Sequence, residues 1–377
     1  MHTVNNFQLG LRVRYAREAL GLSQEQLKAK LGLKDRQTIS DIEKGKRTLK
    51  AAELVQMADV LDKDIPFFLD PFSVVAESRY CWRVSPALPR DELDRCEVVA
   101  SGWLGLLRWL REEHKAAPEP LKHVLRLNAG SSVELAARQA EQLARTALGP
   151  APAEALVEFV ERELGIVVLF VDFGDQVPAG AISGATCTLG ELGDAGELTA
   201  ILINRRLPAA HQSLDLAHGV FNCLTWDAMP PEHREPNTAD PLTGMVRRER
   251  LAHAFATSLL MPTHVLDAHI DPARAADVPH LAGVAARLRV SGEALSWRLA
   301  QLQRIDSETQ WALAGWPGPA EDTSVPSLFS EAFVRMLHVA LDRGWLSARK
   351  AATTLGMTLS GLDGLFAAHE MPSPFEL

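Results

Sequence analysis

The residues with the clearest chemical potential lie in the segment LDLAHGVFNCL, at positions 214 to 224. Two histidines four residues apart share one face of a helix and can bind zinc, and a glutamate directly after the first can take a proton from metal-bound water. This segment keeps His218 but has Gly219 at the glutamate position and Asn222 at the second histidine position. A neutral amide is a poor zinc ligand beside imidazole, and without the carboxylate nothing accepts the proton of the water. The segment therefore keeps one ligand of a hydrolytic zinc centre and lacks its base.

A shifted metal site is the alternative. Glu249 and His253 are four residues apart in RERLAHAFATSLLMP, so on a helix they share a face and could join His218 in a zinc site with three protein ligands. The other interpretation is that these histidines are structural and form hydrogen bonds with their neighbours. No cofactor is predicted apart from zinc at this site, because the chain has neither a GxGxxG motif nor a phosphate-binding loop.

The net charge conceals a local excess of positive charge near the amino terminus. The 377-residue chain has a formal net charge of −9, yet residues 8–50 contain eleven lysines and arginines against five acidic residues. A basic segment on an acidic chain is typical of DNA binding through one end of a protein. The pattern therefore predicts that this segment contacts phosphates.

The basic segment contains two short predicted helices joined by a tight turn. Ser23 and Gln26 form a capping box for the first helix, and Gly32 suits its left-handed end. Asp35 can cap the second helix, which Gly45 ends. The spacing predicts a helix-turn-helix unit.

The second helix of this unit presents side chains suited to base edges. With Ile39 and Ile42 directed to the core, the outward residues are Arg36, Gln37, Thr38, Ser40, Asp41 and Lys44. Arginine pairs with guanine, glutamine pairs with adenine, and a threonine methyl can touch thymine. The residues expected to meet phosphates are Lys44, Lys46, Arg47 and Lys50. The alternative from the pattern alone is an ordinary amphipathic helix pair with a solvated, charged face.

Residues 9–72 resemble the XRE-type helix-turn-helix domain of phage repressors. The resemblance rests on LSQEQL in the second helix, on RQTIS and GKR in and after the third, and on the FL ending. It implies a five-helix fold, a double-stranded DNA partner and a phosphate contact for Gln24, and it places nearest the bases Asp35, Arg36, Gln37 and Asp41. Such domains bind half-sites about one helical turn apart, which implies a homodimer.

The second half of the chain resembles the ImmA/IrrE family of zinc-dependent peptidases. DLAHGVFNCLTWDAMPP and RERLAHAFATSLLMP match the two metal-binding helices of that family in frame, and AISGATCTL and AILINR match its flanking segments. The resemblance implies that His218 and Glu249 occupy ligand positions, whereas Gly219 replaces the catalytic glutamate and Asn222 the second histidine. It implies a peptidase scaffold without its catalytic residues. We therefore predict that the protein is not an enzyme.

The predicted fold is mostly helical with a small α+β domain. Its predicted parts are a five-helix DNA-binding domain (1–71), a helical connector that could pair protomers (72–151), a degenerate peptidase-like domain with a small sheet (152–305) and a helical module (306–377). Strands are expected in IVVLFVD and LTAILIN, with a Gly-rich stretch between them. An apolar stripe in the connector, either core or dimer interface, consists of Trp103, Leu106, Leu107 and Leu110.

Composition excludes several classes of protein. The longest strongly apolar stretch, residues 166–171, is far shorter than the roughly 20 residues that span a bilayer. The first residues lack the pattern of a secretory signal. The four cysteines form no CxxC pair and are too sparse for a disulfide framework. We therefore expect a cytoplasmic protein with no membrane partner.

Together these observations predict a sequence-specific transcriptional regulator whose peptidase-like domain senses or docks a partner without cutting it. The resemblance implies a stress, phage-defence or toxin setting, in which the protein acts as a regulator or antitoxin and its cleft takes a protein, peptide or toxin. Two alternatives stay open. One is a zinc metallopeptidase that cleaves a repressor-like protein through His218, Glu249 and His253. The other is a protein-binding antitoxin in which DNA binding is secondary.

Overall fold

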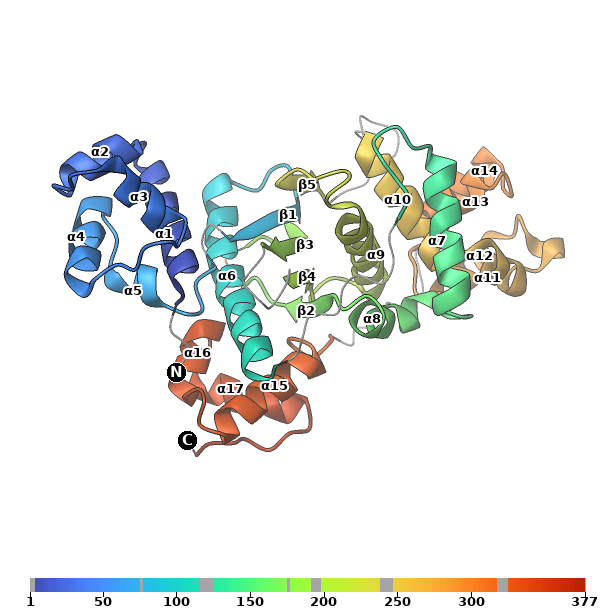
Figure 1. Ribbon diagram of the computed structural model, residues 1–377. Coiled ribbons are helices and arrows are strands. Elements are labelled where there is room, and N and C mark those ends of the chain that lie inside the picture. Colours follow the sequence, from blue (N-terminus) through green and yellow to red (C-terminus); the bar gives the residue numbers. More distant parts are fainter. Residues whose placement is uncertain are drawn as a thin grey trace.

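The structure is a computed structural model that describes residues 4–74, 77–115, 125–174, 177–190, 198–237, 247–316 and 325–376. Its amino-terminal part, the head, is a bundle of five helices (Figure 1): α1 (Asn6–Ala19), α2 (Gln24–Lys30), α3 (Arg36–Glu43), α4 (Ala51–Leu61) and α5 (Ile65–Leu69). Their apolar faces enclose a separate core around Val13, Leu27, Ile39 and Phe68. The predicted five-helix fold of this part is confirmed.

The helix ends in the head follow the predicted capping residues. The hydroxyl of Ser23 accepts a hydrogen bond from the N–H of Gln26, and the N–H of Ser23 donates to the Gln26 side chain. Asp35 caps α3 by accepting from the N–H of Gln37. Gly45 follows α3 with φ +68°, and a Cβ there would lie 2.7 Å from Cα of Phe7. Since this backbone conformation and this contact both exclude a side chain, the turn after α3 requires glycine.

A buried carboxylate holds three helices of the head together. Oε1 of Glu43 lies 2.6 Å from Nε of Arg17 on α1, and Oε2 lies 2.8 Å from Nε2 of Gln24 on α2. Because a buried ion pair is tolerated only when its hydrogen-bonding groups are satisfied, this geometry constrains all three side chains. Glu43 thereby fixes the orientation of α3 relative to α1 and α2.

A five-stranded mixed sheet lies at the centre of the remaining part, the body, in the order β2-β4-β3-β1-β5. The strands are β1 (Ser78–Val84), β2 (Val167–Val171), β3 (Ile182–Leu189), β4 (Leu198–Asn204) and β5 (Arg234–Pro236). β3 is antiparallel to both β4 and β1, whereas the outer pairs β2–β4 and β1–β5 are parallel. The sheet is small, as predicted.

Helices cover both faces of the sheet (Figure 1). On one face Val168, Ile201 and Ile203 join a core with helices α7 (Val133–Ala147), α8 (Pro152–Arg162), α9 (Ala209–Thr225), α10 (Arg247–Leu260), α11 (Thr263–His269), α12 (Val278–Arg287), α13 (Gly292–Gln301) and α14 (Ser307–Ala314). A short 3-10 helix, η2 (Pro272–Arg274), lies between α11 and α12. On the other face Leu169 and Leu202 join α6 (Arg90–Glu113), α15 (Glu331–Asp342), α16 (Ala348–Leu355) and α17 (Leu359–Ala368). None of the helices within the described ranges is long and apolar enough to cross a bilayer.

The region from 72 to 151 differs from the predicted helical connector. Residues 78–84 form β1, an inner strand of the sheet. α6 covers one face of the sheet, and its apolar stripe from Trp103 to Leu110 is buried in the core there. β1 was missed because five of its seven residues are buried, Arg83 among them, so it lacks the alternation of a half-exposed strand. β3 was read only as a Gly-rich stretch for a similar reason, since all eight of its residues are buried.

Two arginines join the head to the body at one backbone carbonyl. Nη2 of Arg12, on α1, lies 2.7 Å from the carbonyl oxygen of Ser73, and Arg108, on α6, donates to the same oxygen at 3.3 Å. Arg108 also forms an ion pair with the buried Glu77 at 2.7 Å. One turn earlier on α6, a Cβ on Gly105 would lie 1.7 Å from the carbonyl oxygen of Phe72. α6 therefore packs directly against the backbone that leaves the head.

We predict that Arg108→Met lowers the free energy of unfolding by about 3–5 kcal/mol, because it leaves the Glu77 carboxylate buried without its ion-pair partner. Urea unfolding followed by circular dichroism measures the change. Arg108→Lys, which keeps the charge, should lower the free energy of unfolding by less. A loss below about 1 kcal/mol for Arg108→Met, the range of an ordinary surface change, would contradict this account of the joint.

Candidate functional site

The face of α3 that sequence analysis assigned to DNA is largely open to solvent. Arg36 and Gln37 at its start, and Lys44, Lys46 and Lys50 after it, are exposed, whereas Thr38 is half-buried. The amide of Gln37 donates to Oδ1 of Asp41 at 2.8 Å, one helical turn later. This bond leaves the carbonyl oxygen of the Gln37 side chain free to accept from a base amine.

Three predicted DNA contacts have other roles in the structure. Ser40 is only 7% exposed, so its assignment to the outward face of α3 is wrong. The core-facing side of α3 is wide enough to include Ser40 beside Ile39, Ile42 and Glu43. Gln24 is half-buried and donates to Glu43, and Arg47 pairs with Glu53 at 2.6 Å. To contact a phosphate, both side chains would have to divide their donor groups between the phosphate and these carboxylates.

The second predicted site lies where α9 and α10 pack together beneath the sheet. An arginine on α10, Arg248, extends toward the position that the second histidine would occupy. Its Nη2 lies 2.7 Å from Oδ1 of Asn222, and its Nη1 forms an ion pair with Glu235 of β5. Nε lies 3.0 Å from the carbonyl oxygen of Met229, and the guanidinium lies over the ring of Phe221. Every nitrogen of this guanidinium therefore has an acceptor.

The side chain of Asn222 forms hydrogen bonds through both its oxygen and its nitrogen, which gives asparagine a structural role at this position. Its oxygen accepts from Arg248, and its amide nitrogen lies 3.4 Å from Sγ of Cys81. Burial raises the pKa of the Cys81 thiol well above its usual value, so the sulfur stays protonated. A histidine at position 222 would lack the oxygen that Arg248 requires.

The two histidines of this centre are uncharged. Arg83 forms a buried ion pair with Asp215 of α9, with Nε and Oδ1 2.7 Å apart. Burial and the charges of Arg83 and Arg248 hold the pKa of His218 well below its usual value. Burial, with the charge of Arg83, lowers the pKa of His253 to about 4. Both imidazoles are therefore neutral at pH 7, chiefly because they are buried.

The donor set here does not fit a zinc ion. His218 offers a buried Nδ1 that has no partner among the described residues, but one imidazole nitrogen is not a site. Across the ranges that the structure describes, no group of three His, Cys, Asp or Glu side chains lies close enough to hold a metal. The predicted ligand set of His218, Glu249 and His253 is therefore not assembled, although α9 and α10 are neighbours.

Gly219 occupies a position where any side chain would press against Ile201. A Cβ at this position would lie 2.8 Å from Cγ2 and 3.0 Å from Cδ1 of Ile201 on β4. Contacts this short require the neighbouring side chain to move. The glutamate that the resemblance places here would therefore collide with the core under the sheet.

We predict that Gly219→Ala destabilises the protein by about 1 kcal/mol, because overpacking against Ile201 costs about 1–3 kcal/mol and the higher helix propensity of alanine returns at most about 1 kcal/mol. Gly283→Ala is the matched control, since Gly283 lies within α12 and a Cβ there meets nothing within 4 Å. This control should gain stability. Equal gains for both variants in thermal unfolding would show that position 219 has room.

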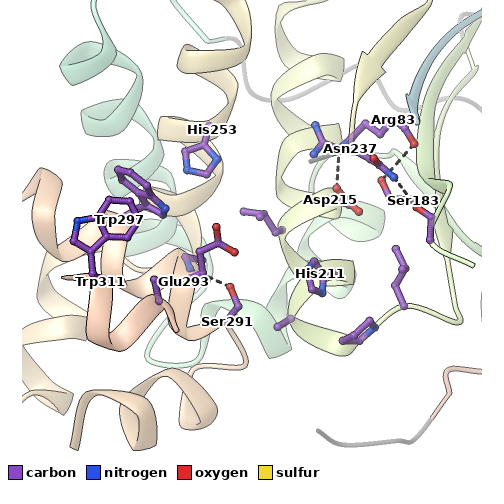
Figure 2. A pocket seen from close by; sticks show the side chains of 17 residues that line it. Arg83, Ser183, His211, Asp215, Asn237, His253, Ser291, Glu293, Trp297 and Trp311 are labelled. Carbon is purple, nitrogen blue, oxygen red and sulfur yellow. Dashed lines mark hydrogen bonds and ion pairs between the residues drawn. The ribbon is translucent and has the colours of Figure 1, made fainter. Parts of the chain in front are cut away.

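A cleft of about 620 Å³ separates α9 from α13 and α14 (Figure 2). Trp297, Trp311 and Glu293 line one wall, and Arg83 and Asp215 lie on the other. Sequence analysis gave none of these residues a role, because they come from separate elements and share no spacing. The one available signal was a pair of tryptophans on neighbouring helices.

Comparisons with known proteins agree with the two-part organisation. A helix-turn-helix family model matches residues 13–68, and a model of the IrrE N-terminal-like domain matches residues 161–300. The chain thus combines these two domains, which confirms the combination predicted from sequence. The second match includes α9 and α10, so Gly219 and Asn222 lie within it.

No curated protein sequence matches the chain. Among solved structures, the chain is similar to the apo form of the competence regulator ComR from Streptococcus vestibularis, at 12% sequence identity over 82% of this chain and 89% of that one. The TM-score is 0.17, so this similarity carries no argument about fold or function.

Proposed function

We propose that the chain, which joins a helix-turn-helix head to an IrrE-like body, is a sequence-specific DNA-binding regulator whose body binds a partner without cleaving it. The observation that carries the proposal is the open, basic face of α3 and the segment that follows it. The exposed Arg36 and Gln37 can read guanine and adenine edges, and Lys44, Lys46 and Lys50 can contact phosphates. The helix-turn-helix match over residues 13–68 supports this assignment.

Loss of peptidase activity is the second part of the proposal. Position 219 lacks the carboxylate that would take a proton from water, and removing a general base costs about 10²- to 10⁴-fold in rate. The oxygen of Asn222 is already bonded to Arg248. A guanidinium has no vacant coordination position and stays protonated, so it cannot activate water as zinc does. In this proposal Arg248 supplies the positive charge of the centre but takes no part in catalysis.

The hydrogen bonds that join the head to the body at the carbonyl oxygen of Ser73 support a regulatory role. Because Arg12 and Arg108 share the carbonyl oxygen of Ser73, a shift of α6 in the body would be transmitted to α1 in the head. We further propose that the protein acts in the cytoplasm as a homodimer, since helix-turn-helix heads usually bind paired half-sites. An antitoxin role stays a prediction from the sequence resemblance.

Fluorescence anisotropy tests the proposal with the full-length protein, DNA from upstream of its own gene, and the same DNA scrambled. Titrations at several salt concentrations separate specific from electrostatic binding. Tighter binding to the upstream DNA, with a steep salt dependence, is expected. Equal affinity for both DNAs at every salt concentration would contradict sequence-specific regulation.

We predict different effects for base-facing and phosphate-facing residues. Arg36→Ala and Gln37→Ala should each cost about 1–3 kcal/mol on the upstream DNA and reduce its preference over scrambled DNA. Lys46→Ala should weaken binding to both DNAs equally and flatten the salt slope by about one unit. Lys63→Ala, between α4 and α5, is the charge-matched control and should change neither the affinity for either DNA nor the salt slope. Equal losses on both DNAs for Arg36→Ala and Gln37→Ala would remove their assignment to base reading.

A further inference from the structure

Two tryptophans form an open aromatic corner on one wall of the cleft between α9 and the α13–α14 pair. The ring centroids of Trp297 and Trp311 are 6.4 Å apart, with an angle of 75° between the ring planes. Trp311 is 60% exposed although it is among the largest apolar side chains. A tryptophan face attracts organic cations through the negative charge of its π system. The corner is therefore an aromatic surface that the described residues leave partly uncovered.

The cleft also carries one uncompensated negative charge. Glu293 lies on the same wall as the two tryptophans (Figure 2), and its carboxylate has no ion-pair or hydrogen-bond partner within the described ranges. On the opposite wall, Arg83 and Asp215 neutralise each other at 2.7 Å. Beyond residue 71 the chain contains 38 acidic residues against 27 lysines and arginines. The local and the overall charge therefore both favour a cationic ligand.

An anion is disfavoured at the same place, although the amino terminus of α13 faces the cleft. The Ser291 hydroxyl already caps this helix by accepting from the N–H of Ala294 at 3.0 Å. Glu293 in the first turn supplies the negative charge that a helix amino terminus attracts. A bound anion would lie beside this carboxylate and be repelled.

We propose that this cleft binds an organic cation, with a guanidinium or ammonium group placed between Glu293 and the faces of Trp297 and Trp311. The inference deepens the proposed function, because it names the class of partner that the body binds. Leu207 and Leu214 on the opposite wall provide apolar surface for the rest of the ligand. A cleft of about 620 Å³ lies within the size range of small-molecule and short-peptide sites. An arginine or lysine side chain of a peptide and a free alkylguanidine share this chemistry.

Isothermal titration calorimetry of the full-length protein at low salt tests the inference with two matched pairs of probes. One pair is the peptide acetyl-Gly-Arg-Gly-Gly-amide and its neutral citrulline counterpart, and the other is n-butylguanidinium and n-butylurea. We expect at least one cation to bind about tenfold or more tightly than its neutral partner, from the ion pair and the cation–π contact together. If the peptide binds much more tightly than n-butylguanidinium, the ligand is peptide-borne. Similar affinities of the two cations indicate that the charged group alone is recognised.

Three variants separate this site from other acidic surfaces. Glu293→Gln and Trp311→Leu should each reduce the preference for the cation to about threefold or less. Glu308→Gln, which removes an exposed carboxylate of α14 outside the cleft, should keep the full preference. Two results overturn the inference: no preference for either cation in the wild type, or a full preference in both Glu293→Gln and Trp311→Leu.

The same preparations, titrated with upstream and scrambled DNA in the absence of any probe, keep the two proposals apart. Glu293→Gln and Trp311→Leu should bind DNA as the wild type does, because neither residue lies in the head. A wild type that binds cations but does not distinguish the two DNAs overturns the regulator and leaves the cation site. A wild type that distinguishes the DNAs but binds neither cation overturns the cation site alone.

Discussion

The half-buried guanidinium of Arg248 forms the interactions on which the centre of the body depends. It connects α10 to α9 through Asn222 and to β5 through Glu235, and it lies over the ring of Phe221. In the family that this region resembles, a metal cation holds the two helices. We propose that in this chain the Arg248 side chain supplies the positive charge instead, since its nitrogens donate to the oxygens of Asn222, Glu235 and Met229. Because Glu235 is buried and Arg248 is largely withdrawn from solvent, removing either charge would leave the other without its ion-pair partner.

The same principle recurs where the head meets the body. Arg12 is fully buried and donates to Phe68 and Ser73, while Arg108 donates to Ser73 and pairs with Glu77. Arginine suits both places because its planar group serves several acceptors at once and does not lose its charge on burial. The backbone between the head and β1 is therefore held by specific hydrogen bonds. This arrangement allows binding in the body to affect the orientation of the head.

Sequence patterns predicted the local structure well. α2, α3, β2 and β4 lie where capping residues and strand patterns placed them, and the five-helix head and the pair of helices α9 and α10 agree with what the two resemblances implied. β1 and β3 were missed because both are buried on two faces, and burial removes the alternation by which a strand is recognised. Ser40 was misplaced because the width of the core-facing side of α3 depends on how α1 packs against it.

The candidate sites were predicted less completely, since they depend on contacts between distant segments. The absence of the base and of the second histidine was evident from the sequence alone, from Gly219 and Asn222. The role of Arg248 was not, because it requires Asn222 and Glu235 to be brought together from α9 and β5. The tryptophan corner of the cleft likewise forms only when α13 and α14 pack. Long-range contacts of this kind have no periodic signature in a single sequence.

The measurement that tests the central claim most directly is the zinc content of the purified full-length protein by plasma emission spectrometry, with thermal unfolding recorded before and after treatment with a chelator. If Arg248 has taken the place of the metal, zinc should be far below one equivalent per chain, and the unfolding midpoint should not change. One equivalent of zinc that is lost in His218→Ala, together with a lower midpoint after chelation, would contradict the claim and restore the metallopeptidase alternative.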